Sequence, residues 1–276
     1  MFQLARKRLA GFEGFSMPCP QMLCSAIGEL QFRQETNELS SSCDVAQKQR
    51  GPAVDPLDGP DAIDEHDECD RRLIDAALLL VLWRCASTDE TAAGSRLRLM
   101  KLAFLASRRF AEESIHALNV RFYRWRYGPM SNDVYEIWER LQRAGLMEEE
   151  EVWSLTMSGE LLAQGFYDEV LGEEGNAPVK AVLDEVADKW RSAWSAQPLI
   201  NHIYDLPLSI DGSGPAIRDM PEGSDFDVPL TASEASVSLE VSYSWVETLA
   251  LSLNPEAMMM LNAAVEDFRA GRYVVA

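Results

Sequence analysis

The sequence predicts a compact, mainly α-helical domain with a small β element that includes a winged-helix-like helix–hairpin–helix unit (α+β). Apolar residues recur at helical spacing through most of the central part of the chain. Only short stretches alternate between apolar and polar residues as strands do. Between residues 132 and 166, a capped helix, a Gly-Leu pair, an acidic turn, a strand and a second helix start follow one another. This order is expected of a winged-helix-like unit.

Length and charge limit the classes of function. The 276 residues are 47% hydrophobic, enough for one or two domains with a sizeable core. The net charge is −20 and is unevenly placed: residues 73–143 carry 11 basic and 8 acidic side chains, whereas residues 144–276 carry 6 and 24. Affinity for phosphates is built from Lys and Arg contacts, so this balance disfavours general nucleic-acid binding.

Composition divides the chain into four segments. Residues 1–68 have few large apolar groups towards their end and are predicted to be a disordered N-terminal extension. Met17 and Met22 leave open a later start codon. Residues 69–205 form the predicted helical domain, residues 206–232 a linker or loop rich in Pro, Gly, Asp and Ser, and residues 233–276 a C-terminal strand and helix appendage.

Cysteine usage and hydropathy bear on the compartment. The five cysteines are odd in number and contain no CxxC pair, which fits a reducing cytoplasm better than a disulfide framework or a zinc site. The longest apolar run, Ala76 to Trp83, is far shorter than the ~20 residues of a membrane helix. We expect a cytoplasmic protein without membrane contact.

Two helices are predicted to build the first part of the core. They run from Leu73 to Cys85 and from Arg96 to Phe110. Leu99–Ala106, in the second helix, is apolar almost all round and should therefore be central. Within this run, we interpret Lys101 as a lysine whose stem packs while its ammonium group reaches solvent.

An aromatic and arginine-rich stretch follows. We expect an extended segment at Leu118–Phe122, a turn at Gly128-Pro129, and a helix capped by Ser131, Asn132 or Asp133. Its arginines, Arg121, Arg124 and Arg126, either bind single-stranded nucleic acid together with the neighbouring aromatic rings or lie over those rings in a half-buried strand. The second interpretation is favoured, because the carboxylates of Glu148–Glu151 would repel a phosphate backbone.

Prolines mark the predicted starts of the remaining helices. Pro178, Pro198 and Pro255 each stand where a helix is predicted to begin, and Asn254 is placed as the cap of the last helix. A strand-like start at Val237 precedes that last part of the chain.

No catalytic, cofactor-binding or metal-binding apparatus is visible. The histidines, His66, His116 and His202, lack carboxylate or cysteine partners at ligand spacing. Neither a Walker A loop nor GxGxxG occurs. We predict that the protein is not an enzyme and uses no cofactor or metal.

Three motifs together resemble the Panacea domain over about residues 73–205. They are Met-Lys-Leu-Ala-Phe-Leu-Ala at 100–106, Tyr-Arg-Trp-Arg-Tyr-Gly-Pro-Met-Ser-Asn-Asp-Val-Tyr at 123–135, and Leu-Thr-Met-Ser-Gly at 155–159. Members of that family read Lys-Leu-x-Tyr/Phe-Leu, then an aromatic-rich Tyr-Gly-Pro-Val corner, then Leu-Thr-x-x-Gly. The motif positions, structural or partner-binding, are Lys101, Phe104, Tyr123, Trp125, Tyr127, Gly128, Pro129, Val134, Tyr135, Leu155, Thr156 and Gly159.

The resemblance implies a bacterial or phage antitoxin that neutralises a protein toxin encoded nearby by direct binding. SocA-like members also deliver the bound toxin to the ClpXP protease. The chain departs from the family in its N-terminal extension, in Phe104 where Tyr is common, and in its acidic region after residue 205. Two alternatives stay open: a winged-helix transcriptional regulator that binds its own promoter DNA, although DNA is a disfavoured partner, and a phage or mobile-element protein that binds a host factor.

Overall fold

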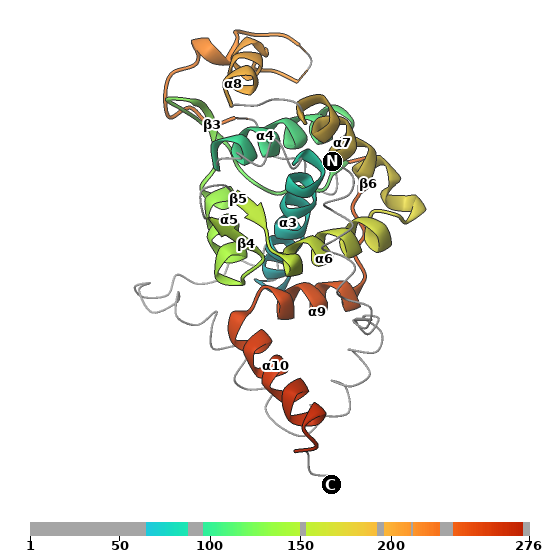
Figure 1. The fold of residues 1–276 in the computed structure, drawn as a ribbon. Coiled ribbons are helices and arrows are strands. Elements are labelled where there is room, and N and C mark those ends of the chain that lie inside the picture. Colours follow the sequence, from blue (N-terminus) through green and yellow to red (C-terminus); the bar gives the residue numbers. More distant parts are fainter. Residues whose placement is uncertain are drawn as a thin grey trace, which may run out of the picture. The chain divides into compact units, whose positions relative to one another are not determined.

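Helix α3 (Glu65–Ala86) lies at the centre of the fold (Figure 1). The helices that contact it are α4 (Arg96–Glu112), α5 (Asn132–Arg143), α6 (Met157–Gly165), α7 (Ala177–Trp190) and α9 (Tyr243–Ser252). Every residue from Ala76 to Trp83 is at most 2% exposed. A helix that is apolar on all sides must be covered on all sides, which explains this ring of neighbours. The predicted first core helix is confirmed, and it begins earlier than predicted, at Glu65.

A computed structural model of the chain describes residues 65–87, 96–149, 153–191, 196–210, 212–226 and 234–272. Residues 63–276 belong to one compact unit. The predicted disorder of residues 1–68 therefore falls outside the described residues, except for residues 65–68, which lie in α3.

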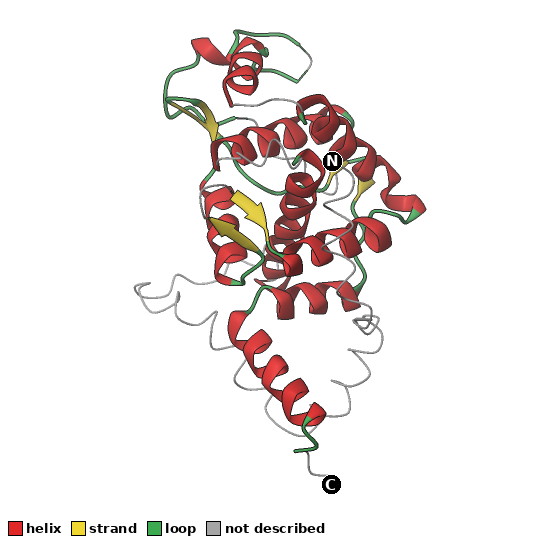
Figure 2. Ribbon diagram, viewed as in Figure 1, coloured by secondary structure: helices red, strands yellow, loops and turns green. Residues whose placement is uncertain are grey.

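The fold is mainly helical with small sheets, as predicted (Figure 2). No helix in the described ranges combines the length and apolar character needed to cross a membrane. The other helices are α4 (Arg96–Glu112), α5 (Asn132–Arg143), α6 (Met157–Gly165), α7 (Ala177–Trp190), α8 (Ala196–Asp205), α9 (Tyr243–Ser252) and α10 (Pro255–Arg269). The strands are β1 (Ile115–His116), β2 (Tyr123–Trp125), β3 (Gly128–Met130), β4 (Met147–Glu149), β5 (Trp153–Leu155) and β6 (Val237–Ser238).

The segment from α5 to α6 has the predicted order of helix, antiparallel hairpin and helix. Ser131 caps α5, because its side chain accepts a hydrogen bond from the Val134 amide at 3.3 Å. After Gly145, β4 and β5 pair with Met147 opposite Leu155. The apolar stripe of α5 is buried, and its Trp138 ring meets that of Trp83 edge-on at 5.8 Å between centroids.

The segment predicted as a linker or loop after residue 205 packs against the core where it is described. The Arg124 amide donates to the Ser224 carbonyl, and the Gly223 amide donates to the Arg124 carbonyl, both at 2.7 Å. The Phe226 amide donates to the Phe122 carbonyl at 3.0 Å. A 3-10 helix, η5 (Ile217–Asp219), buries Ile217 completely. The segment is irregular, but it forms part of the packed unit.

The C-terminal strand and first C-terminal helix also join this unit. β6 pairs in parallel with β1, and the Trp245 ring of α9 lies edge-on to that of Phe166 at 5.6 Å. The side chain of Asn176 holds the segment between β6 and α9 in place. Its Nδ2 donates to the carbonyls of Val170 (2.9 Å) and Glu240 (2.8 Å). The Glu240 amide donates back to Asn176 Oδ1 at 3.0 Å. All three hydrogen bonds converge on a side chain that is 1% exposed.

Helix α10 is the least covered helix among the described residues. Asn254 caps it through the amides of Glu256 and Ala257, which confirms the predicted Asn-Pro helix start. None of its residues is buried, and Met260 and Phe268 are 72% and 66% exposed. Contacts with α9 hold it to the rest of the unit.

We predict that Asn176→Ala will loosen the C-terminal segment. The change deletes three hydrogen bonds and removes the Asn176 partner of both the amide and the carbonyl of Glu240, whereas the Val170 carbonyl keeps the Glu173 amide at 3.3 Å. The free energy of unfolding should fall by about 2–4 kcal/mol. Urea unfolding measures this loss, and hydrogen exchange should show faster exchange at the Glu240 amide. The exposed Asn262→Ala on α10 is the control. Equal effects of the two variants would contradict the prediction.

Candidate functional site

The lysine of the first motif is buried, and its amine contacts the second motif. Lys101 is 2% exposed in α4, and its Nζ donates to the Pro129 carbonyl at 2.6 Å. The interpretation that its ammonium group reaches solvent is therefore wrong. Burial, together with the nearby Arg124 guanidinium, lowers the pKa of the Lys101 amine to about 7. The interaction joins α4 directly to strand β3.

Strands β2 and β3 form a hairpin that carries most of the second motif. Trp125 pairs with Gly128, so the turn lies at Arg126 and Tyr127 and not at the predicted Gly128-Pro129. The extended pairing likewise begins at Tyr123, after the predicted segment. Gly128 has a φ of +90°, and a Cβ there would lie 3.4 Å from Lys101 Nζ. Glycine is therefore favoured here by the backbone conformation, while a Cβ at that distance would make only an ordinary van der Waals contact with the lysine.

Aromatic side chains near the hairpin turn are exposed. Trp125 is 48% and Tyr127 59% exposed, and Arg126 between them is also exposed. Tyr123 is half-buried, donates through its hydroxyl to Asn132 Oδ1 at 3.2 Å and meets the Trp125 ring edge-on at 6.3 Å. We call Trp125, Arg126 and Tyr127 the hairpin tip.

The arginines of this stretch separate into two environments. Arg121 and Arg126 are exposed, whereas Arg124 is only 8% exposed. The Arg124 guanidinium lies over the Tyr204 ring, 5.0 Å from its centroid, and its Nε donates to the Ile217 carbonyl at 3.3 Å. Arg124 thus lies over an aromatic ring, but this ring belongs to Tyr204 in α8 and not to the neighbouring aromatic residues that the interpretation named.

Other motif residues pack in the interior. Phe104 is 5% exposed, and its ring lies 5.3 Å from that of Phe122 and 5.1 Å from that of Phe226. Val134 is buried on α5, and Tyr135 beside it is half-buried against the core. These positions stabilise the fold and present little surface to a partner.

The third motif forms a separate junction between the β4–β5 hairpin and α6. The Thr156 side chain accepts from the Gly159 amide at 3.1 Å and donates to the Gly145 carbonyl at 2.7 Å. A Cβ on Gly159 would lie only 2.0 Å from the Leu146 carbonyl oxygen. Position 159 therefore requires glycine, because the backbone of residue 146 approaches it so closely. Leu155, at the end of β5, packs half-buried against the core.

The motif residues thus occupy two sites. Lys101, Tyr123, Trp125, Gly128 and Pro129 come together around the β2–β3 hairpin, with Tyr127 at its tip. Leu155, Thr156 and Gly159 meet elsewhere, at the start of α6. Sequence reasoning missed Tyr204, Ile217 and Arg218 beside the hairpin. Tyr204 follows the helix start predicted at Pro198, whereas Ile217 and Arg218 lie in the predicted linker and belong to no motif.

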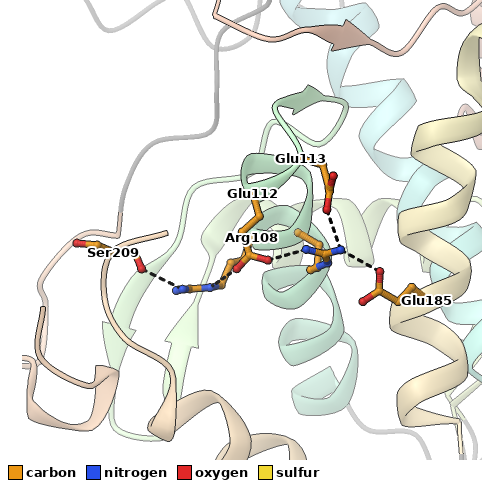
Figure 3. Close-up of polar contacts among 6 residues, drawn as sticks. Arg108, Glu112, Glu113, Glu185 and Ser209 are labelled. Carbon is orange, nitrogen blue, oxygen red and sulfur yellow. Dashed lines mark hydrogen bonds and ion pairs between the residues drawn. The ribbon is translucent and has the colours of Figure 1, made fainter. Parts of the chain in front are cut away.

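The last turn of α4 holds a second group of charged residues (Figure 3). Arg108 contacts Glu112 at 2.9 Å and donates to the Ser209 carbonyl at 3.1 Å. Arg109 contacts Glu112, Glu113 and Glu185 at 2.9 to 3.1 Å. Both guanidinium groups are matched by carboxylates, so this group ties α4 to α7 and has no positive charge left for an anionic ligand.

The described residues contain no group of metal-ligating side chains. The His116 ring nitrogen contacts Asn119 Oδ1 at 2.8 Å, and His202 lies beside the Trp190 ring. Cys69 is exposed and Cys85 is half-buried, while the other three cysteines and the side chain of His66 lie outside the described part. Of the acidic run Glu148–Glu151, the Glu148 side chain is described and is exposed.

Comparisons with family models, curated proteins and solved structures find no match to this chain. The resemblance to the Panacea domain therefore depends on the motifs and on how they are arranged here.

We predict that the buried amine makes stability depend on pH. Between pH 7 and 10.5 the unfolded chain protonates Lys101 and the folded chain does not, so the free energy of unfolding should rise with pH. The slope can reach about 1.4 kcal/mol per pH unit. Lys101→Met should flatten this slope in urea unfolding measured across that window.

Lys180 is half-exposed, so Lys180→Met serves as the control. This variant should keep the wild-type dependence of unfolding free energy on pH. The buried Asp75 carboxyl, whose pKa burial raises to about 7, acts in a different window. Between pH 3.8 and 7 the folded chain protonates Asp75 and the unfolded chain does not. The contribution of Asp75 to the free energy of unfolding therefore falls as pH rises through this window. An unchanged slope above pH 7 in Lys101→Met would contradict the prediction for the lysine.

We predict that Gly159→Ala will destabilise the protein. The added methyl group would collide with the Leu146 carbonyl oxygen, and backbone can only move away by opening the junction. Overpacking of this kind costs about 1–3 kcal/mol or more. Gly175→Ala, where an added Cβ meets nothing within 4 Å, should change the thermal midpoint little. Similar midpoints for the two variants would show that the junction is not tight.

Proposed function

We propose that this protein is an antitoxin that neutralises a cognate protein toxin by direct binding. The observation that carries the proposal is the contact between two motifs that are distant in sequence. The Lys101 amine of the first motif donates to the carbonyl of Pro129 in the second, and Gly128 leaves room for it. Residues of the Panacea pattern thus depend on one another physically, which supports the resemblance and the antitoxin function that it implies.

We place the toxin contact at the hairpin tip. Trp, Tyr and Arg are the residue types most enriched among side chains that dominate binding energy at interfaces. Trp125, Arg126 and Tyr127 are consecutive and exposed, and the hairpin below them is anchored by Lys101. A rigid support reduces the entropy lost on binding. The exposed aromatic rings are the part of this site that a protein partner can cover.

The finer elements of the proposal rest on the resemblance. We propose that α5, β4, β5 and α6 are the winged-helix-like unit, since a capped helix, a paired hairpin and a second capped helix follow in order. Delivery of the bound toxin to the ClpXP protease, as in SocA-like members, is a further part of it. The promoter-binding alternative has less support, because Arg124 is buried and only Arg121 and Arg126 remain to face phosphate.

We predict that the hairpin tip is needed for neutralisation. The neighbouring reading frame should stop growth when expressed alone and should be tolerated with this protein from a second plasmid. Trp125→Ala with Tyr127→Ala should abolish the rescue, because losing two hot-spot residues costs about 2 kcal/mol or more each in affinity. Co-purification of the two proteins measures the same loss.

Tyr243→Ala is the matched control, since this tyrosine is 75% exposed on α9. It should rescue growth as the unaltered protein does. Thermal unfolding of all variants separates lost binding from lost folding, because exposed substitutions usually change stability by less than about 0.5 kcal/mol. No rescue by the unaltered protein would sink the antitoxin proposal, and rescue by the double variant would move the contact elsewhere.

A further inference from the structure

A cavity of about 390 Å³ lies between β2, α8 and η5. It is lined by Arg124 from β2, by Asn201, Tyr204 and Asp205 from α8, and by Arg218 from η5. The Tyr204 hydroxyl donates to the Arg126 carbonyl at 2.8 Å, so one wall is tied to the hairpin. Of the lining residues, Arg124 alone lies in one of the motifs found in the sequence.

The most buried wall residue is a cation without a carboxylate. Arg124 is 8% exposed, and its Nη1 has no hydrogen-bond partner among the described residues. Its contacts are the Ile217 carbonyl and the face of the Tyr204 ring, both uncharged. Burying a guanidinium group without a counter-charge is costly, so an anion at this position would stabilise the protein.

The charges that line the cavity define the charge of its ligand. Arg218 contacts the Asp205 carboxylate, and these two charges cancel. Arg124 then leaves one positive charge at the cavity, and a monoanion balances it. The guanidinium fork matches the two oxygens of a carboxylate. A phosphate dianion would instead leave an excess negative charge beside Asp205.

The shape of the cavity indicates where the carboxylate comes from. Asn201, Asp205 and Arg218 are exposed, so the cavity is open to solvent on the side that they form. Sites for free small molecules usually enclose the ligand and are mostly apolar. An open polar hollow instead suits a side chain that projects from another protein.

We propose that this cavity accepts the carboxylate of an aspartate or glutamate side chain from a protein partner, which pairs with Arg124. The assignment of that partner as the toxin rests on the function proposed above, but carboxylate binding by the cavity does not. Arg218 and Asp205 set the affinity, because Arg218 adds attraction and Asp205 competes for it.

The first experiment uses a free probe and the full chain labelled with ¹⁵N-arginine. Nα-acetyl-aspartate N-methylamide should shift the Arg124 Nε–Hε NMR signal in a saturable way, and the uncharged asparagine analogue should not. Arg218→Gln should weaken binding at least about tenfold, the size expected for losing a charge-assisted hydrogen bond. Asp205→Asn should strengthen binding, because it removes the competing carboxylate.

Arg143→Gln, an exposed arginine on α5 that does not line the cavity, is the control and should bind as the unaltered chain does. An Arg124 signal that does not move, or that moves equally with the asparagine analogue, would overturn the proposal. So would an Asp205→Asn variant that binds no tighter. Inorganic phosphate that binds as tightly as the aspartate probe would replace the carboxylate assignment with a general anion site.

The second experiment separates the cavity from the antitoxin function. In the growth assay, Arg218→Gln should reduce rescue and Arg143→Gln should not. If the unaltered chain fails to rescue growth, the antitoxin proposal falls, while the probe titration still decides whether the cavity binds a carboxylate. If rescue depends on Arg218 and the probe does not bind, the side-chain carboxylate proposal is wrong and the antitoxin proposal stands.

Discussion

The burial of Ala76–Trp83 in α3 is the constraint on which the other elements depend. Because Ala76–Trp83 is apolar on every side, α4, α5, α6, α7 and α9 must all cover it. This placement fixes α4, whose own apolar run is buried as well, and it directs Lys101 away from solvent. The hairpin then supplies the Pro129 carbonyl, which accepts a hydrogen bond from the lysine amine.

The buried Lys101 amine, which costs free energy to bury, constrains the structure of the β2–β3 hairpin. A buried amine with a pKa near 7 makes no favourable charge pair, so its hydrogen bond to Pro129 is its main compensation. Opposite it, the φ of +90° at position 128 favours glycine, because L side chains rarely adopt that conformation. The hairpin tip is consequently held on a support that tolerates few changes.

Local sequence signals predicted the helices well, because periodicity and caps act within a few residues. The starts at Ser131 and Asn254 are examples, since each cap bonds to amides two or three positions away. The burial of the Lys101 amine could not be predicted in this way. A lysine in an apolar run is equally compatible with a packed stem whose ammonium group reaches solvent. Asn176 and Arg218 were missed for a related reason: their partners lie far along the chain or in segments without periodicity.

The contact between α3 and α9 has a consequence for how the chain is made. Helix α3 is synthesised before the five helices that cover it, and α9 is synthesised only after residues 87–242. The parallel pairing of β1 with β6 imposes the same delay, since it joins residues 115 and 237. Contacts so distant in sequence form slowly, and uncovered apolar surface promotes aggregation. Nascent chains that end before α9 therefore carry an incompletely covered α3, which makes them natural clients of chaperones that bind at the ribosome.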